Sequence, residues 1–190
     1  MPTPLLELFM VRGFLDPATC DALVARIDAE RRPSEIADDV GIAGFRTSET
    51  CDLDWRDPVV GEVDRRIAAL LGLPLAMSEP LQGQRYAPGQ EFKPHTDTFT
   101  PGGVDFYAHC AEQGQRTWTA MLYLNVPEDG GATRFKAIGK TIQPETGKLV
   151  AWNNLLADGS PNDATLHQGM KVRRGTKYVI TKWFREYAAA

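Results

Sequence analysis

The stretch GTKYVITKWF, residues 175–184, is strongly β-prone. Its β-branched and aromatic side chains favour the pleated, half-buried surface of a strand. This stretch belongs to a predicted strand at residues 177–185, and short runs of the same character lie at residues 81–86, 91–96, 117–126, 132–135, 148–152 and 165–172. Glycine, proline and acidic residues form turn signals between them, and no helical pattern is expected there. The chain after Pro80 is therefore predicted to form a sandwich or barrel of short strands.

Two helices are predicted ahead of this region. Asp-Pro pairs at positions 16–17 and 57–58 each supply an N-cap followed by proline at the first helical position. Apolar residues at helical spacing follow both pairs, and Gly72 closes the second helix. Residues 33–56 are expected to form a long polar loop, and such loops are often functional. Helices followed by many short strands indicate an α+β chain.

Composition limits the classes of protein that need to be considered. The chain has 190 residues, of which 43% are hydrophobic and 24% charged, so it can bury the core of one domain. Its net charge of −4 argues against nonspecific binding to nucleic acid or to an anionic membrane surface. No apolar run approaches the roughly 18 residues of a membrane span, and the N-terminus does not read as a secretory signal. Three widely spaced cysteines predict reduced thiols in a cytoplasmic protein rather than a disulfide framework.

A small set of histidines and one aspartate predicts a metal site. His95 and Asp97 are two positions apart at the end of a predicted strand, so both side chains can point to one face. That pair alone is a weak signal, but His167 adds a second imidazole in the late β region, whereas His109 is expected in a loop. Two histidines and one carboxylate are the ligands of non-haem Fe(II) oxygenases. The same ligand types also suit a zinc hydrolase, so these residues leave the metal open.

Lys177 is the second chemical signal, because it lies inside the β-prone run. A lysine on a buried strand needs an anionic partner. The far carboxylate of a dicarboxylate co-substrate would supply one. The alternative is an exposed lysine on an edge strand.

Taken in order along the chain, these motifs resemble the prolyl 4-hydroxylase branch of the 2-oxoglutarate/Fe(II)-dependent dioxygenases. The matching stretches are QRYAPGQ (84–90), KPHTD (93–97), RTWTAMLYLN (116–125), GGATRF (130–135), LVAW (149–152), HQG (167–169) and TKW (181–183). The resemblance covers roughly residues 8–186. It implies an α+β fold: a double-stranded β-helix, or jelly-roll barrel, with N-terminal helices packed against it. We expect one catalytic domain over 1–190, with a helical part at about 1–79 and the barrel core at about 80–187.

The resemblance also implies roles for individual residues. It makes His95, Asp97 and His167 the iron ligands, and Lys177 the partner of the distal carboxylate of 2-oxoglutarate; these four form the implied catalytic set. Further implied contacts with the co-substrate come from Tyr86, Thr119, Tyr123 and Trp183, and contacts with the substrate come from Arg46, Arg116 and Trp183. The implied cofactors are Fe(II), 2-oxoglutarate and O2, with ascorbate as a reductant. From the residues alone, the aromatic side chains are equally well explained as core and the two arginines as solvated.

The implied activity is hydroxylation of a proline, at C4, in a peptide or protein. It couples decarboxylation of 2-oxoglutarate to succinate with oxidation of a substrate C–H bond. Two alternatives stay open: a hydroxylase of a free amino acid or other small molecule, and a jelly roll that binds a ligand without turnover. The segments 33–56 and 98–116 are long enough to close over either kind of substrate.

Overall fold

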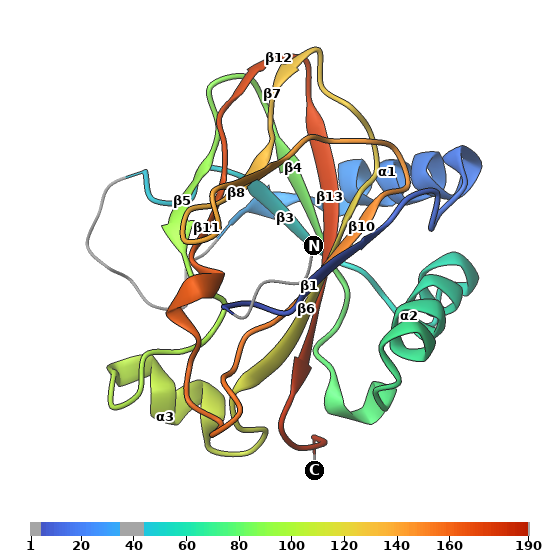
Figure 1. The fold of residues 1–190 in the computed structure, drawn as a ribbon. Coiled ribbons are helices and arrows are strands. Elements are labelled where there is room, and N and C mark those ends of the chain that lie inside the picture. The colour runs from blue at the N-terminus through green and yellow to red at the C-terminus, as the bar shows by residue number, and fades with distance from the viewer. Residues whose placement is uncertain (1–4, 35–43, 190) are drawn as a thin grey trace.

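The computed structural model describes residues 5–34 and 44–189, and two antiparallel sheets form its centre (Figure 1). The large sheet has the order β1-β10-β6-β13-β4-β3-β2 and the small sheet the order β5-β11-β8-β9; β12 pairs with β7. The large sheet comprises β1 (Leu8–Val11), β10 (Leu149–Asn153), β6 (Arg116–Tyr123), β13 (Lys177–Arg185), β4 (Gln82–Tyr86), β3 (Glu49–Asp52) and β2 (Arg32–Pro33). The other strands are β5 (Phe92–His95), β11 (His167–Gly169), β8 (Thr133–Phe135), β9 (Lys140–Ile142), β12 (Val172–Arg174) and β7 (Asp129–Gly130).

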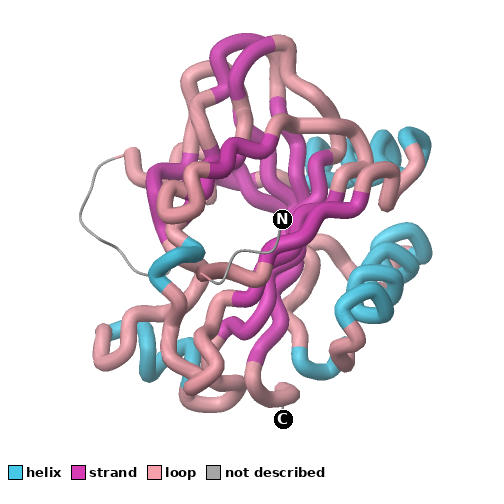
Figure 2. Tube along the Cα trace, in the orientation of Figure 1, coloured by secondary structure: helices cyan, strands magenta, loops and turns pink. Residues whose placement is uncertain are grey.

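Helices α1 (Pro17–Glu30) and α2 (Pro58–Leu71) lie together on one side of the large sheet (Figures 1 and 2). Both begin as predicted. The Asp16 carboxylate accepts a hydrogen bond from the Thr19 amide, and the Asp57 carboxylate accepts one from Val59. Gly72 ends α2 with φ +67°, a left-handed conformation that glycine adopts without steric cost.

The alternation of side chains along the strands divides the core in two. One apolar cluster joins the helices to the outer face of the large sheet, for example Leu23 and Ile67 with Leu122 and Ile180. A second cluster fills the space between the two sheets and includes Phe135. Successive residues of a strand point to opposite faces, so each central strand contributes to both clusters. The inner cluster surrounds the site described below.

The N-terminal part is not purely helical, which corrects the expectation for residues 1–79. β1 extends one edge of the large sheet through β10, and β3 extends the other edge through β4. β3 lies within the predicted loop 33–56, whose residues 35–43 fall outside the described residues. This strand is four residues long and three of the four are polar, so its ladder to β4 stabilises it more than its own sequence pattern does.

Two further expectations for the later part of the chain are wrong. Helix α3 (Val104–Cys110) lies among the strands, inside the segment 98–116 where no helix was predicted. The run 165–172 is not one strand: it contains the end of a 3₁₀ turn, η2 (Asp163–Thr165), then β11, and then the start of β12. β11 pairs with β5 and β8, whereas β12 pairs with β7, so a change of partner divides the run. A second 3₁₀ turn, η1 (Leu75–Met77), follows α2.

The three cysteines are free, as their spacing predicts. Among the described residues, no helix has the length and apolar character needed to cross a membrane.

Candidate active site

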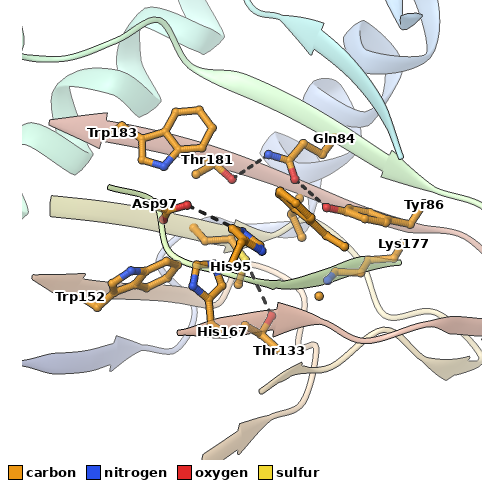
Figure 3. Close-up of a pocket in the computed structure, with 14 residues that line it drawn as sticks. Gln84, Tyr86, His95, Asp97, Thr133, Trp152, His167, Lys177, Thr181 and Trp183 are labelled. Atoms are coloured by element: carbon orange, nitrogen blue, oxygen red, sulfur yellow. Dashed lines mark hydrogen bonds and ion pairs between the residues drawn. The ribbon is translucent and has the colours of Figure 1, made fainter. Parts of the chain in front are cut away.

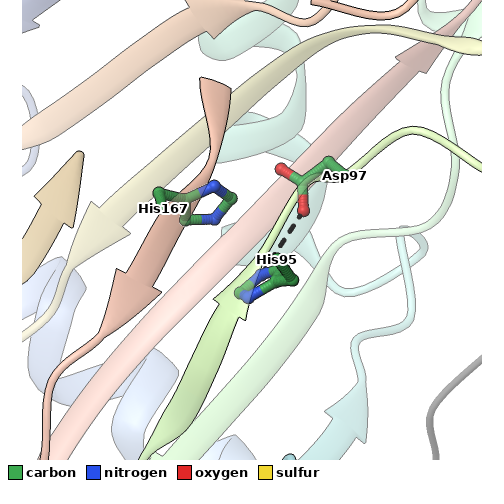
Figure 4. A group of neighbouring side chains, drawn as sticks. All are labelled: His95, Asp97 and His167. Atoms are coloured by element: carbon green, nitrogen blue, oxygen red, sulfur yellow. Dashed lines mark ion pairs between the residues drawn. The ribbon is translucent and has the colours of Figure 1, made fainter. Parts of the chain in front are cut away.

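Strand pairing brings the predicted metal ligands together. His95 ends β5, His167 begins β11, and the two residues are direct partners in the ladder between these strands. Asp97 follows β5 by two residues. One ligand atom from each of the three side chains lies within 4.8 Å of the others, and the side chains converge from two neighbouring segments (Figure 4). His95 Nε2 lies 3.8 Å from Asp97 Oδ1.

Backbone carbonyls orient both imidazoles. His95 Nδ1 lies 2.7 Å from the Lys93 carbonyl oxygen, and His167 Nδ1 lies 3.0 Å from the Thr165 carbonyl oxygen. A carbonyl oxygen only accepts, so each Nδ1 carries the hydrogen and each Nε2 keeps its lone pair for a metal ion. Neither carbonyl contact was predicted, because a backbone acceptor leaves no signature in the sequence.

Burial sets the charges of the cluster. It lowers the pKa of His95 to about 3, and the nearby His167 adds to this effect, so His95 is neutral at physiological pH. Burial alone would raise the pKa of Asp97, but His167, His95 and Arg116 hold that pKa below its usual value. The cluster therefore offers an ionised carboxylate together with a neutral His95 imidazole and the imidazole of His167.

A pocket of about 420 Å³, part of it open to solvent, adjoins this cluster (Figure 3). Side chains from both sheets form its walls. They are Gln84, Tyr86, Phe92, His95, Asp97, Met121, Thr133, Trp152, His167, Gly169, Lys177, Val179, Thr181 and Trp183. A larger cavity, about 1180 Å³ by the same measure, is lined by residues such as Trp55, Leu75 and Lys182 and contains none of the cluster.

Lys177 lies in this pocket and not on a sheet edge. β13 is flanked by β6 and β4, and the side chain is only 2% exposed. Its ammonium lies 5.0 Å from the centre of the Tyr86 ring and 5.3 Å from that of Tyr123. Within the described part of the chain no carboxylate forms an ion pair with it, and burial lowers its pKa to about 7. The pocket thus presents an amine that gains from an incoming anion.

The other residues implied for the co-substrate divide into two layers. Tyr86 and Trp183 line the pocket, whereas Thr119 and Tyr123 lie behind its wall. The Thr119 hydroxyl donates to Asp97 Oδ2 at 2.6 Å, and the Tyr123 hydroxyl donates to Thr133 Oγ1 at 2.6 Å. Direct contact of these two residues with a co-substrate stays a prediction.

The two implied substrate arginines are both engaged by protein groups. Arg46 donates to Ser48 Oγ at 3.0 Å, and its guanidinium lies over the Phe92 ring, which in turn stacks on His95. Arg116 stacks on the Trp183 ring at 4.0 Å. It also donates to both oxygens of Glu79, at 2.6 and 2.7 Å. Each guanidinium therefore packs against an aromatic ring that lines the pocket, Phe92 for Arg46 and Trp183 for Arg116. Their contact with substrate stays a prediction.

Two residues of the pocket wall, Gln84 and Trp152, were not predicted as site residues from the sequence. Gln84 accepts a hydrogen bond from the Tyr86 hydroxyl and donates to Thr181 at 3.2 Å (Figure 3). Trp152 presents its ring to His167 at a centroid distance of 4.9 Å. The period-two alternation of β4 would have placed Gln84 on the same face as Tyr86. Only the sheet pairing, which sets Gln84 opposite Val179, brings Thr181 within reach, two residues further along β13 on the same face.

These residues fit a ferrous ion and an anionic chelating acid. Two imidazoles and one carboxylate leave coordination positions free for other ligands. Among the described residues, the buried amine of Lys177 has no carboxylate partner, and the buried indole nitrogens of Trp152 and Trp183 have no hydrogen-bond partner. The fold and the site thus define the class of non-haem iron oxygenases that use an acidic co-substrate.

The particular family follows from comparison with known proteins. The model of the 2OG-Fe(II) oxygenase superfamily matches residues 81–185, which is more than half of the chain, so the chain belongs to this superfamily. Its relatives include rat prolyl 4-hydroxylase subunit alpha-1, which is 34% identical over 145 residues, and rat subunit alpha-3, which is 38% identical over 146 residues. These matches cover 76% and 75% of this chain but 27% and 26% of the relatives. The chain therefore spans about a quarter of the length of these relatives.

Solved structures agree with this assignment. The viral collagen prolyl hydroxylase of Paramecium bursaria Chlorella virus-1, described as a 2OG complex, has a TM-score of 0.76 at 25% identity, over 95% of this chain and 96% of the viral one. A Pseudomonas putida prolyl-4-hydroxylase has a TM-score of 0.65 at 23% identity, over 94% and 92% of the two chains, which supports the fold. The predicted α+β jelly roll, the oxygenase family and its Fe(II), 2-oxoglutarate and O2 are thereby confirmed.

Proposed function

We propose that this chain is a prolyl 4-hydroxylase that acts on proline within a peptide or protein. The relatives named prolyl 4-hydroxylase and the viral collagen prolyl hydroxylase, which matches almost end to end, support this substrate class. The observation that carries the oxygenase chemistry is the buried Lys177, which has no ion-pair partner in the part of the chain that the structure describes and shares a pocket with the histidine–aspartate–histidine cluster. This lysine and the order of the family motifs argue against a zinc hydrolase built on the same ligands.

The cluster of His95, Asp97 and His167 would hold iron, and Lys177 would bind the far carboxylate of 2-oxoglutarate. When bound, iron and 2-oxoglutarate supply the oxidising power, as O2 converts the acid to succinate and CO2 and one oxygen atom enters the substrate C–H bond. The chain itself does four things: it keeps His95 neutral, orients both imidazoles, neutralises the acid through Lys177 and excludes water from that pair.

Trp183 and Arg116 are proposed to face the substrate. Trp183 lines the pocket, and its indole nitrogen has no hydrogen-bond partner among the described residues. The stacked Arg116 fixes the plane of its ring. Arg46 is proposed to contact the peptide backbone, because its guanidinium covers Phe92 at the outer side of His95.

The test is turnover by purified protein supplied with Fe(II), 2-oxoglutarate and ascorbate. Mass spectrometry should show a gain of one oxygen atom on a proline-containing peptide, matched by succinate. The same peptide with alanine in place of proline should stay unmodified. His95→Ala should abolish turnover, whereas His109→Ala, which removes the histidine outside the cluster, should retain it.

Other outcomes separate the alternatives. Oxygen gain on free amino acids but not on peptides would replace the peptidyl substrate with a small molecule. No succinate with any substrate would favour a jelly roll that binds without turnover. Turnover that survives His95→Ala would remove this residue from the ligand set.

Three narrower points are also proposals. We propose that ascorbate serves as the reductant, and that residues 1–190 act as one catalytic domain. The free thiols of Cys20, Cys51 and Cys110 support a reducing compartment such as the cytoplasm.

A further inference from the structure

Thr119 and Asn154 form a buried polar layer behind the metal cluster. Thr119 lies on β6 and is 1% exposed, and Asn154 directly follows β10 and is fully buried. β10 pairs with β6, with Trp152 opposite Thr119, and the Asn154 amide continues the ladder by donating to the Thr117 carbonyl at 2.7 Å. Asn154 plays no part in the proposed chemistry, yet burying a side-chain amide is costly unless it is bonded.

A chain of two hydrogen bonds links this amide to the metal cluster. Asn154 Nδ2 donates to Thr119 Oγ1 at 2.9 Å, and Thr119 Oγ1 donates to Asp97 Oδ2 at 2.6 Å. An ionised carboxylate only accepts, so the single hydroxyl hydrogen of Thr119 must lie on the bond to Asp97. The hydroxyl must then receive a hydrogen on its other side, which an amide N–H provides. The direction of the whole chain is therefore fixed.

This direction distinguishes the two oxygens of Asp97. Oδ2 is held by the Thr119 hydroxyl, while Oδ1 is the oxygen that lies 3.8 Å from His95 Nε2. We propose that Asn154 is a positioning residue of the metal centre: acting through Thr119, it holds one carboxylate oxygen of Asp97 and presents the other to the metal. This inference rests on the proposed function only in requiring that the cluster binds a metal ion.

The loop after Asn154 orients a second ligand. The Asn154 carbonyl accepts from the Asn162 amide at 2.9 Å, and the Asn162 carbonyl accepts from the Thr165 hydroxyl at 2.7 Å. The Thr165 carbonyl in turn faces His167 Nδ1 at 3.0 Å. Asn154 thus fixes Asp97 through its side chain and lies at the start of the backbone path that fixes His167. Partners of this kind typically change metal affinity 10–100-fold when they are removed.

The test measures Co(II) binding directly, by titration of its visible absorption, and not only turnover. Thr119→Val removes the hydroxyl at similar volume and should weaken Co(II) binding roughly 10–100-fold, while Thr119→Ser should stay within about threefold of the parent. Asn154→Asp should weaken binding at least as much, because an aspartate would draw the Thr119 hydrogen away from Asp97.

Thr117→Val is the matched control, since it makes the same change two positions earlier on β6, where the hydroxyl bonds only the Phe184 carbonyl among the described residues. Circular dichroism melting separates folding from binding, and the valine and serine variants of Thr119 decide the outcome if Asn154→Asp does not fold. Equal Co(II) affinity in Thr119→Val and the parent would overturn the positioning role and leave the proposed function intact. Failure of the parent itself to bind Co(II) would overturn both.

Discussion

Two buried lysines on β13 differ in whether the described part of the protein supplies a carboxylate to pair with them. Lys177 and Lys182 are each 2% exposed and lie five residues apart, so they point to opposite faces of the sheet. Lys182 Nζ lies 2.7 Å from a carboxylate oxygen of Asp64 on α2. Lys177 faces the metal pocket and, within the described ranges, has no carboxylate partner.

The difference shows how a buried charge is to be interpreted. A buried ammonium costs free energy unless an anion compensates it. The outer face supplies that anion from the protein, which makes Lys182 part of the fold. The described residues of the inner face supply none, which supports the proposed role of Lys177 as the receptor for an anion from solution. Five predictions test this division.

Lys177→Met should have the largest effect. The far carboxylate of 2-oxoglutarate would be left buried and unpaired, which costs about 3–5 kcal/mol and corresponds to a loss of affinity of roughly 100-fold or more. Calorimetric titration with 2-oxoglutarate at saturating Co(II) measures it. Co(II) affinity should change little, and equal losses of both affinities would contradict the assigned role.

Lys182→Met should instead destabilise the fold. Asp64 would lose its only ion-pair partner among the described residues, at a cost of about 3–5 kcal/mol in the free energy of unfolding. Urea denaturation measures it. Adding Asp64→Leu should restore much of the loss, because the pair would then be replaced by apolar groups. No recovery in the double variant would show that the pair itself is not the cause.

The affinity for 2-oxoglutarate should depend on pH through Lys177. Burial lowers the pKa of its amine from 10.5 to about 7, so the free site loses its proton above that pH and binding must restore it. Affinity should fall as pH rises above about 7, by up to about tenfold per pH unit. Titrations at several pH values measure this, with Lys177→Arg as a control that stays charged and should give a flat profile.

The same lysine affects the stability of the ligand-free protein in the opposite direction. Between about pH 7 and 10.5 the unfolded chain binds more protons at Lys177 than the folded chain does. The contribution of this group to the free energy of unfolding therefore rises with pH across that window. Lys177→Met should remove this contribution. Urea denaturation of parent and variant at several pH values measures it, and a difference in unfolding free energy that stays constant between pH 7 and 10.5 would contradict it.

The smallest effects should come from two tyrosines on opposite faces. Tyr86→Phe keeps the ring beside Lys177 but loses its hydrogen bond to Gln84, so 2-oxoglutarate affinity should fall only about 2–10-fold. Tyr178→Phe loses the hydroxyl that donates to Asp28 on α1 and should cost about 1–2 kcal/mol of unfolding free energy with no change in that affinity. If Tyr86→Phe changed only the unfolding free energy and Tyr178→Phe lowered the affinity for 2-oxoglutarate, the division between the two faces of the sheet would be refuted.

The candidate site was largely predictable because its chemistry uses rare residue types. The chain has three histidines, and two of them fall in β-prone runs, one of them two positions from Asp97. Lysine is equally conspicuous inside a run such as TKYVITKW, but the run contains two lysines and gives both the same signal. Their different roles depend on Asp64, which lies far away in the sequence on another element.

Short strands and local acceptors were the hardest features to predict. β3 exists because β4 offers it a ladder, and α3 lies in a segment with no clear helical signal. The carbonyls of Lys93 and Thr165, which orient the imidazoles, are backbone groups present at every position. Such features arise from pairing between distant segments, which a local pattern does not encode.

The amino-acid sequence by itself determined the two capped helices, the succession of strands after Pro80, and the residue types able to bind a metal ion and an acid. Each of these follows from local propensity or side-chain chemistry. The tertiary structure alone decided that His95 pairs with His167 across one ladder and that, among the described residues, Lys182 has a carboxylate partner while Lys177 has none. It alone also decided that Asn154 donates to Thr119, which donates to Asp97. The physical reason is that charge compensation and hydrogen-bond direction depend on which groups lie next to each other in space, and only folding brings those groups together.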